Sequence, residues 1–320
     1  MKKLALLLGA LSLVSSVAYA KEVVPAVEEV VVVEEAAPVA AAPALRVTSF
    51  GQSIEIDNYS RHDNRGYKLD TDTNDIGNVM LGTSVGLAYG DDWTFNFFAR
   101  KGWDTDTDKG THSNGHRIDM DVWRNYDNFS VGARWRQEAS KDRYLLRAKY
   151  SYGMFSGWVD AGYESKNGGA GSTDNWYSEG MPVAVTVGPL TVGYYYEWDD
   201  VIDYTGSDRE DAQDRNYEGS LKHQIRLMAP LYTGEKLSVG AEYRYQFAHD
   251  MEYKEEYRWA ENNRHIAILN ASYAVTDRLT VSGYYEYDFN DYDLHDAKDG
   301  DPKLSDDYYG EFGLGWTYSF

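Results

Sequence analysis

The stretch that decides the fold is DYYGEFGLGWTYSF, residues 307–320, at the end of the chain. Reading back from Phe320, every second residue is large and apolar or aromatic: Tyr318, Trp316, Leu314 and Phe312. The residues between them are small or polar: Ser319, Thr317, Gly315, Gly313 and Glu311. Alternation with a period of two predicts a β-strand with two unlike faces.

The two faces of this strand differ in a way that favours a membrane over a soluble sandwich, which would also alternate. The apolar face carries aromatic residues at its end, where a bilayer interface would hold them. The other face carries glycine and hydroxyl groups, as in a wet lumen. The terminal Phe320 also resembles the C-terminal signature of bacterial outer-membrane β-barrels, which usually end in Phe.

The same alternation repeats along the chain from Leu45 onward. Six hairpins are predicted, and their apolar alternates lie within residues 79–99, 118–135, 144–163, 181–198, 225–247 and 267–289. A first strand near 47–58, whose alternation slips around Gly51 at a predicted bulge, and the last strand bring the count to fourteen. We therefore expect an all-β, transmembrane, antiparallel up-and-down β-barrel, with twelve or sixteen strands as alternatives.

The predicted connections are of two unequal kinds. Tight turns fall on one side, and long polar connections fall on the other: 58–77, 102–116, 166–175, 199–216, 248–264 and 290–306, with 139–143 as the short exception. Short periplasmic turns and long external loops are typical of outer-membrane barrels.

Bulk composition agrees with this class and excludes others. The mean hydropathy of −0.59 does not exclude a barrel, because only alternate residues of each strand face lipid. The formal net charge of −21 argues against nucleic acid, which requires clustered basic residues. The chain has no cysteine, so disulfides, thiol catalysis and a lipoprotein anchor are excluded.

The first 44 residues precede the predicted barrel. Residues 1–20 have the charged, apolar and A-x-A regions of a secretory signal peptide, with cleavage after Ala20. Residues 21–44 are a low-complexity extension rich in Ala, Val, Glu and Pro. It is either a flexible periplasmic linker or a short element that contacts a periplasmic partner. Residues 45–320 form the predicted barrel, located in the bacterial outer membrane.

Several short stretches resemble a known porin family. They are His223–Pro230 (HQIRLMAP), Glu286–Phe289 (EYDF) with His295–Asp296, and the ending Tyr318–Phe320. These resemble the outer membrane protein G family of monomeric fourteen-stranded porins. The signal peptide and the Lys21–Val23 start resemble those of fusobacterial-type outer-membrane porins. The resemblance implies a channel for ions and small hydrophilic solutes, without fixing a substrate. We expect a monomer and no cofactor.

If the apolar alternates face lipid, the others line the pore. The expected pore-lining charges are Arg100, Arg117, Asp119, Asp121, Arg134, Arg136, Arg147, Lys149, Lys222, Arg226, Glu242, Arg244, Glu286, Asp288 and Glu311. Bases dominate the third to sixth strands and acids the last two, which would lie opposite in a closed barrel of fourteen. Opposed walls of this kind would set a transverse field. The alternative is that these side chains only pair with their neighbours.

Two histidines, His265 and His295, are candidates for a pH gate, because imidazoles gain charge below about pH 6. In the family that the chain resembles, a histidine pair in this region is linked to gating. Two exposed loop histidines without function are the alternative.

Other functions stay open. Acidic, aromatic loops such as 253–259 could bind a partner and make the barrel a surface adhesin. His112–Ser113, His249–Asp250 and His295–Asp296 are the pairs that a membrane enzyme could use. Catalysis would also require a placed nucleophile or water, which the sequence does not show, and we expect no enzymatic activity. Residues 70–75 and 104–108 begin like calcium loops but lack the required Gly and Glu, so no metal site is expected. The expected partners are outer-membrane lipid, lipopolysaccharide and small solutes.

Overall fold

The computed structural model describes residues 44–61, 76–106, 110–166, 174–202, 217–253, 258–260, 263–290 and 307–320. All regular elements in these ranges are β-strands. None of the described residues forms a helix that is long and apolar enough to cross a membrane. The signal peptide, the low-complexity extension and His295 lie outside the described residues.

Fourteen long strands and one short strand make up the fold. Their bounds are β1 Leu45–Arg61, β2 Ile76–Tyr89, β3 Trp93–Asp106, β4 Gly110–Asn125, β5 Phe129–Glu138, β6 Lys141–Tyr152, β7 Phe155–Lys166, β8 Asn175–Val187, β9 Leu190–Val201, β10 Tyr217–Thr233, β11 Leu237–Tyr253, β12 Arg258–Ala260, β13 Arg264–Ala274, β14 Leu279–Asn290 and β15 Asp307–Ser319.

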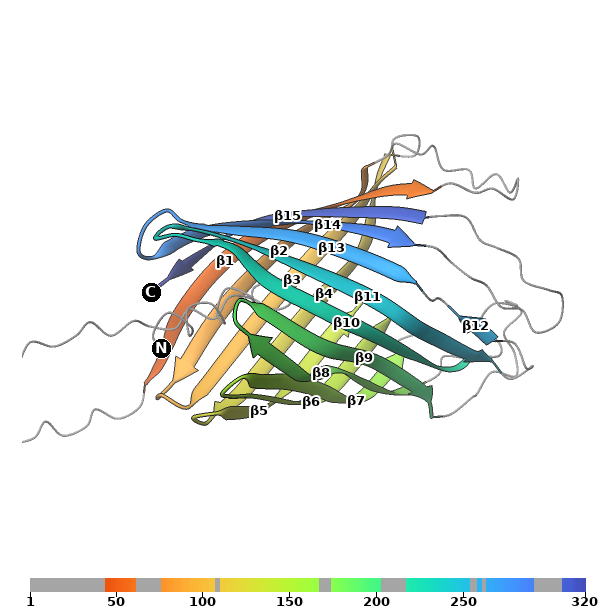
Figure 1. Ribbon diagram of the computed structural model, residues 1–320, viewed down its shortest axis with the longest axis horizontal. Helices are drawn as coiled ribbons and strands as arrows, with labels where there is room; N and C mark the ends of the chain where they lie inside the picture. Colours follow the sequence, from red (N-terminus) through yellow and green to blue (C-terminus); the bar gives the residue numbers. More distant parts are fainter. Residues whose placement is uncertain are drawn as a thin grey trace, which may run out of the picture.

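The long strands form one closed antiparallel sheet. Each pairs with its neighbours in chain order, and the first and last strands pair with each other, with Ser49 opposite Ser319 and Asp57 opposite Glu311. The three-residue β12 pairs only with the end of β11. The prediction of a fourteen-stranded up-and-down barrel is confirmed (Figure 1). Closure gives every long strand two partners, so that no edge stays unpaired.

Tight turns lie at the end of the barrel where β1 begins and β15 ends (Figure 1). Gly153 and Gly188 sit in two of these turns with φ of 59° and 60°, a conformation that glycine adopts without steric cost. At the other end the strands run further than the sequence predicted. Residues 104–106 pair with 110–112, and 250–252 pair with β12, so that parts of the expected 102–116 and 248–264 loops are strand.

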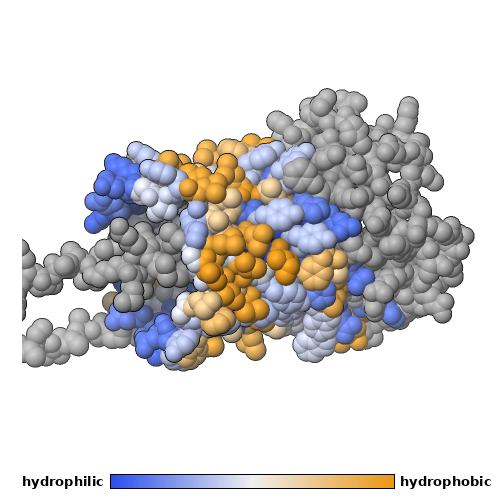
Figure 2. All heavy atoms as spheres, in the orientation of Figure 1, coloured by the Kyte–Doolittle hydropathy of each residue, from blue (hydrophilic) through white to orange (hydrophobic). Residues whose placement is uncertain are grey.

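The outer surface carries the predicted apolar alternates. Leu146, Leu269 and Leu314 are exposed there at mid-strand. Exposed aromatic residues lie towards both ends, such as Tyr152 near the tight turns and Trp176 near the opposite end. Figure 2 shows hydrophobic side chains gathered over the middle of the visible surface, with hydrophilic ones at the end that holds the turns. Aliphatic residues flanked by aromatic belts are typical of a surface that faces a bilayer.

Two details of register differ from the sequence prediction. The irregularity predicted around Gly51 lies slightly earlier in the chain, since pairing with β2 is continuous through Gly51 and shifts between Val47 and Ser49, with a second shift between Ile56 and Asn58. A further irregularity lies between Gly180 and Val183 in β8. It places Met181 opposite Trp158, on the lumenal face beside Gly193, whereas the alternation had placed Met181 outside.

Candidate pore wall

The lumenal face consists of the residues that alternate with the apolar outer positions. Register places all fifteen of the predicted pore-lining charges on this face, since each pairs across the strands with other inward positions: Arg100 with Arg117, Asp121 with Arg134, and Glu286 with Glu311. Their side chains make hydrogen bonds, ion pairs and cation–π contacts in local clusters, and together these clusters form a belt around the wall.

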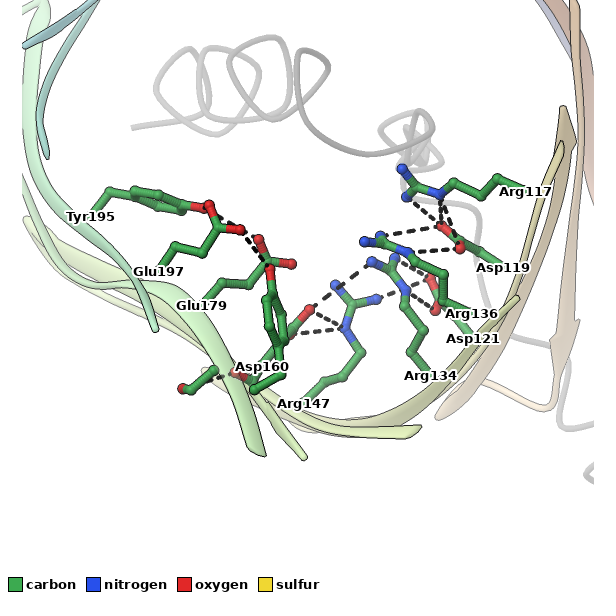
Figure 3. Close-up of polar contacts among 12 residues, drawn as sticks. Arg117, Asp119, Asp121, Arg134, Arg136, Arg147, Asp160, Glu179, Tyr195 and Glu197 are labelled. Carbon is green, nitrogen blue, oxygen red and sulfur yellow. Dashed lines mark hydrogen bonds and ion pairs between the residues drawn. The ribbon is translucent and has the colours of Figure 1, made fainter. Parts of the chain in front are cut away.

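One part of the belt is centred on Asp119 of β4, which is 4% exposed. Its carboxylate accepts hydrogen bonds from Arg117 Nε at 3.1 Å on the same strand and from Arg136 Nε of β5 at 2.9 Å. These side chains point into the lumen in Figure 3. Two arginines thus share one carboxylate, which leaves a local excess of positive charge.

A ring of four alternating charges follows on β4 to β7 (Figure 3). Asp121 accepts from Arg134 Nε at 2.6 Å and from Arg147 Nη1 at 3.0 Å. Asp160 lies 2.9 Å from Arg147 Nε and 4.0 Å from Arg134 Nη1. All four side chains are at most 10% exposed. Charge-assisted bonds of this kind fix each arginine against the wall.

The belt continues through tyrosines on β8 and β9. Arg143 of β6 pairs with Glu164 at 2.5 Å and lies 3.8 Å from the centre of the Tyr177 ring. The Tyr177 hydroxyl donates to Glu197, which also pairs with Lys222 Nζ at 2.9 Å. Guanidinium over an aromatic face is an attractive contact.

The remaining part of the wall, on β11 to β15 and β1, is richer in acids. Arg244 pairs with Glu242 at 2.6 Å and lies 3.7 Å from Glu286. Arg264 pairs with Asp288, and the Tyr284 hydroxyl donates to Glu311.

Arg100 of β3 reaches across β2 to Glu55 of β1 at 3.0 Å. The β2 partner of Arg100 is Gly82, which has no side chain to obstruct this reach. The β2 partner of Glu55 is Met80, so the ion pair crosses β2 diagonally. This ion pair links the acidic sector to the arginine-rich one.

Glycines on the lumenal face seat large side chains flat against the wall. Tyr284 lies over Gly313, Phe98 over Gly82 and Trp123 over Gly132. A Cβ added at Gly132 would lie 2.8 Å from Trp123 Cε3, closer than atoms pack. Lys149 Nζ in turn lies 4.5 Å from the centre of the Trp123 ring.

Sequence reasoning missed several lumenal residues of the belt: Glu55, Arg143, Asp160, Glu164, Tyr177, Glu179, Tyr195 and Glu197. The alternation contained the necessary signal, since Asp160 falls between the outward Val159 and Ala161. With these acids, the excess of base predicted on the third to sixth strands is offset by carboxylates of β1 and β7. The transverse field stays a prediction.

His265, a candidate for the pH gate, is the second residue of β13 and lies on the outer face, not in the lumen. Its Nδ1 lies 2.6 Å from the Tyr243 hydroxyl, and its ring stacks on Tyr245 at 5.0 Å. The same type of contact occurs at His223, whose Nδ1 lies 2.6 Å from the Tyr194 hydroxyl. Charging His265 would therefore act on the pore only through the rim of the barrel, and the gate stays a prediction.

Comparison with known proteins gives little beyond this geometry. No family model and no curated protein matches the chain. Solved structures that are similar include OmpT of Vibrio cholerae (14% identity, 89% of this chain and 100% of that chain, TM-score 0.46). Others are the anion-selective porin from Comamonas acidovorans (12%, 87% and 100%, 0.43) and the outer membrane channel DcaP of Acinetobacter baumannii (12%, 88% and 99%, 0.40). We infer neither family nor activity from similarities at this level.

Proposed function

We propose that this chain is an outer-membrane porin, a water-filled channel for passive diffusion of ions and small hydrophilic solutes. The observation that supports this most is the pairing of an apolar outer band with a lumen lined by charges. A closed barrel with that division of faces is compatible with lipid outside and water inside.

The seating of the lumenal side chains supports an open lumen over a packed one. In small barrels the interior is filled by side chains, whereas larger barrels enclose a channel. Here Trp123 and Tyr284 lie flat over glycines, and the arginines of β4 to β6 bend towards carboxylates of the same wall or an adjacent strand. Such contacts hold the side chains along the wall and away from the axis.

The alternative functions, which are adhesion, metal binding and catalysis, depend largely on residues outside the described part of the chain. These include most of residues 253–259, residues 70–75, and His295–Asp296. We propose a pore without enzymatic activity, acting in the outer membrane as a monomer after removal of the signal peptide.

A planar bilayer measurement tests the channel directly. Purified, refolded protein is expected to produce discrete ion conductance steps in potassium chloride. Heat-denatured protein in the same detergent is the control for detergent-induced leakage. Insertion without conductance, shown by protection of the barrel from added protease, would contradict the proposal.

A further inference from the structure

One lumenal arginine differs from the others in what it contacts. Among the described residues of the lumenal wall, Arg226 of β10 has no carboxylate within ion-pairing distance, whereas the arginines of β3 to β6 each contact one. Its Nε and Nη2 both donate to Gln224 Oε1, at 3.1 and 3.0 Å. The in-register neighbour of Arg226 on β11 is another arginine, Arg244, which forms an ion pair with Glu242.

The contacts of Arg226 hold its guanidinium in a fixed position. Gln224 is 5% exposed, and its amide donates to Gln246, which is fully buried, so that its oxygen is directed at Arg226. The guanidinium also stacks on Tyr195, with its carbon 3.6 Å from the ring centre. Because the groups that hold one edge and one face of this guanidinium are neutral, no ion pair within the described ranges neutralises its charge, and its remaining N–H donors are available to the lumen.

A carboxylate without an ion-pair partner in the described part of the chain lies at the hydroxyl end of Tyr195. Glu179 of β8 accepts a hydrogen bond from the Tyr195 hydroxyl at 3.2 Å. Within the described residues no lysine or arginine lies at ion-pairing distance from it, whereas the neighbouring Glu197 is paired with Lys222. Figure 3 shows Glu179 and Tyr195 directed towards one another on the lumenal side.

We infer that Arg226, Tyr195 and Glu179 form a lumenal subsite for small zwitterions of the α-amino acid class. The solute's carboxylate takes the free donors of Arg226, and its ammonium group takes Glu179. Tyr195 is 6% exposed and lies between the two charges, which it holds in place through its ring and its hydroxyl group. The half-buried Trp158, whose ring centre lies 6.2 Å from that of Tyr195, offers its ring to the solute's apolar part.

Surrounding charges favour a zwitterion over a singly charged solute. The other charges of this region are already paired: Lys222 with Glu197, Arg143 with Glu164, and Glu242 with Arg244. A zwitterion pairs with both Arg226 and Glu179 and adds no net charge to this region. An anion would pair with Arg226 but be repelled by Glu179, and a cation would pair with Glu179 but be repelled by Arg226.

The inference rests on the proposed channel, and the experiment separates the two. Leucine, 4-methylpentanoate and 3-methylbutylamine share the same branched alkyl group. Leucine carries both charges, 4-methylpentanoate only the carboxylate and 3-methylbutylamine only the ammonium group. Each is added at neutral pH to single channels in bilayers at low salt. Leucine is expected to reduce the current saturably, with a half-saturating concentration on the order of fivefold to tenfold lower than that of either analogue.

The variants Arg226→Gln and Glu179→Gln are each expected to remove this preference while ion conductance persists. Arg226→Lys, which keeps the charge without the planar fork, should retain only part of it. Lys149→Gln and Glu311→Gln each remove one lumenal charge elsewhere and should leave the preference unchanged.

Two results would overturn the inference: equal effects of the three solutes, or equal effects of Arg226→Gln and Lys149→Gln. Either result would be obtained on a conducting channel, so the proposed function would survive it. Absence of ion conductance would instead contradict the channel itself.

Discussion

Single glycines decide how far aromatic side chains reach into the lumen. Tyr284 lies directly over Gly313, its in-register partner, and donates to Glu311 from there. Gly313→Ala would place a methyl group where the Tyr284 ring lies, so the ring must turn towards the axis. We expect a lower single-channel conductance, measured in bilayers.

The double variant Gly313→Ala with Tyr284→Ala provides the control for this prediction. It keeps the added methyl group but removes the displaced ring, and the conductance should return to at least the original value. Low conductance in the double variant would mean that the alanine acts on the backbone and not through Tyr284.

Asp121 holds two arginines, so its charge matters for both stability and selectivity. Asp121→Asn leaves Arg134 and Arg147 with Asp160 as their remaining carboxylate in the four-charge ring. We expect the free energy of unfolding to fall by about 1–3 kcal/mol, because a nearly buried charged group loses a partner. Urea titration in detergent measures this change, and the reversal potential should shift towards anions.

Adding Arg134→Gln to Asp121→Asn removes the surplus positive charge again. The reversal potential of the double variant should return towards that of the unmodified channel. If Asp121→Asn leaves both quantities unchanged, the ring does not contribute to the wall in the way its distances indicate.

At the scale of the element, adjacent residues of one strand experience different surroundings. Leu269 of β13 is 52% exposed on the outer face, whereas Asn270 points into the lumen beside Gly240. Leu269→Arg would place a charge in lipid and cost about 2–4 kcal/mol near the bilayer midplane. We expect weaker insertion into lipid vesicles, measured by the shift in urea midpoint.

Asn270→Arg introduces the same side chain one position away and serves as the matched control. Since it faces water, it should insert normally and alter ion selectivity instead. Equal destabilisation by both variants would show that β13 does not separate lipid from lumen.

At the scale of the whole molecule, ion preference follows from the sum of its charges. The net charge is −21, while acids and bases are largely paired along the lumenal belt. We therefore expect weak cation selectivity set by charges outside the belt, which fades as salt shortens the Debye length. The measurement is the reversal potential in a potassium chloride gradient at low and at high salt.

Two outcomes would contradict this account of selectivity. One is anion preference at low salt. The other is an Arg134→Ala, Arg136→Ala double variant with unchanged conductance and selectivity, since these arginines would then contribute nothing to the field in the pore.

The sequence by itself determined the barrel and the division of its faces. A period of two, repeated from Leu45 to Phe320, specifies which residues lie on each side of a strand, because side chains alternate along it. The strand count followed from the number of repeats. The fifteen charges placed in the lumen follow the same rule, which needs no knowledge of neighbouring strands.

Only the tertiary structure decided which of those charges meet. Arg100 reaches Glu55 across β2, and Arg147 joins Asp121 of β4 to Asp160 of β7, because the register between neighbouring strands brings these side chains within reach. Met181 points inward because of a bulge in β8, which the alternation of apolar residues in the sequence does not predict. Register depends on the turns, on bulges and on the matching of faces between two strands, so the pattern of one strand alone does not specify which residues lie opposite each other.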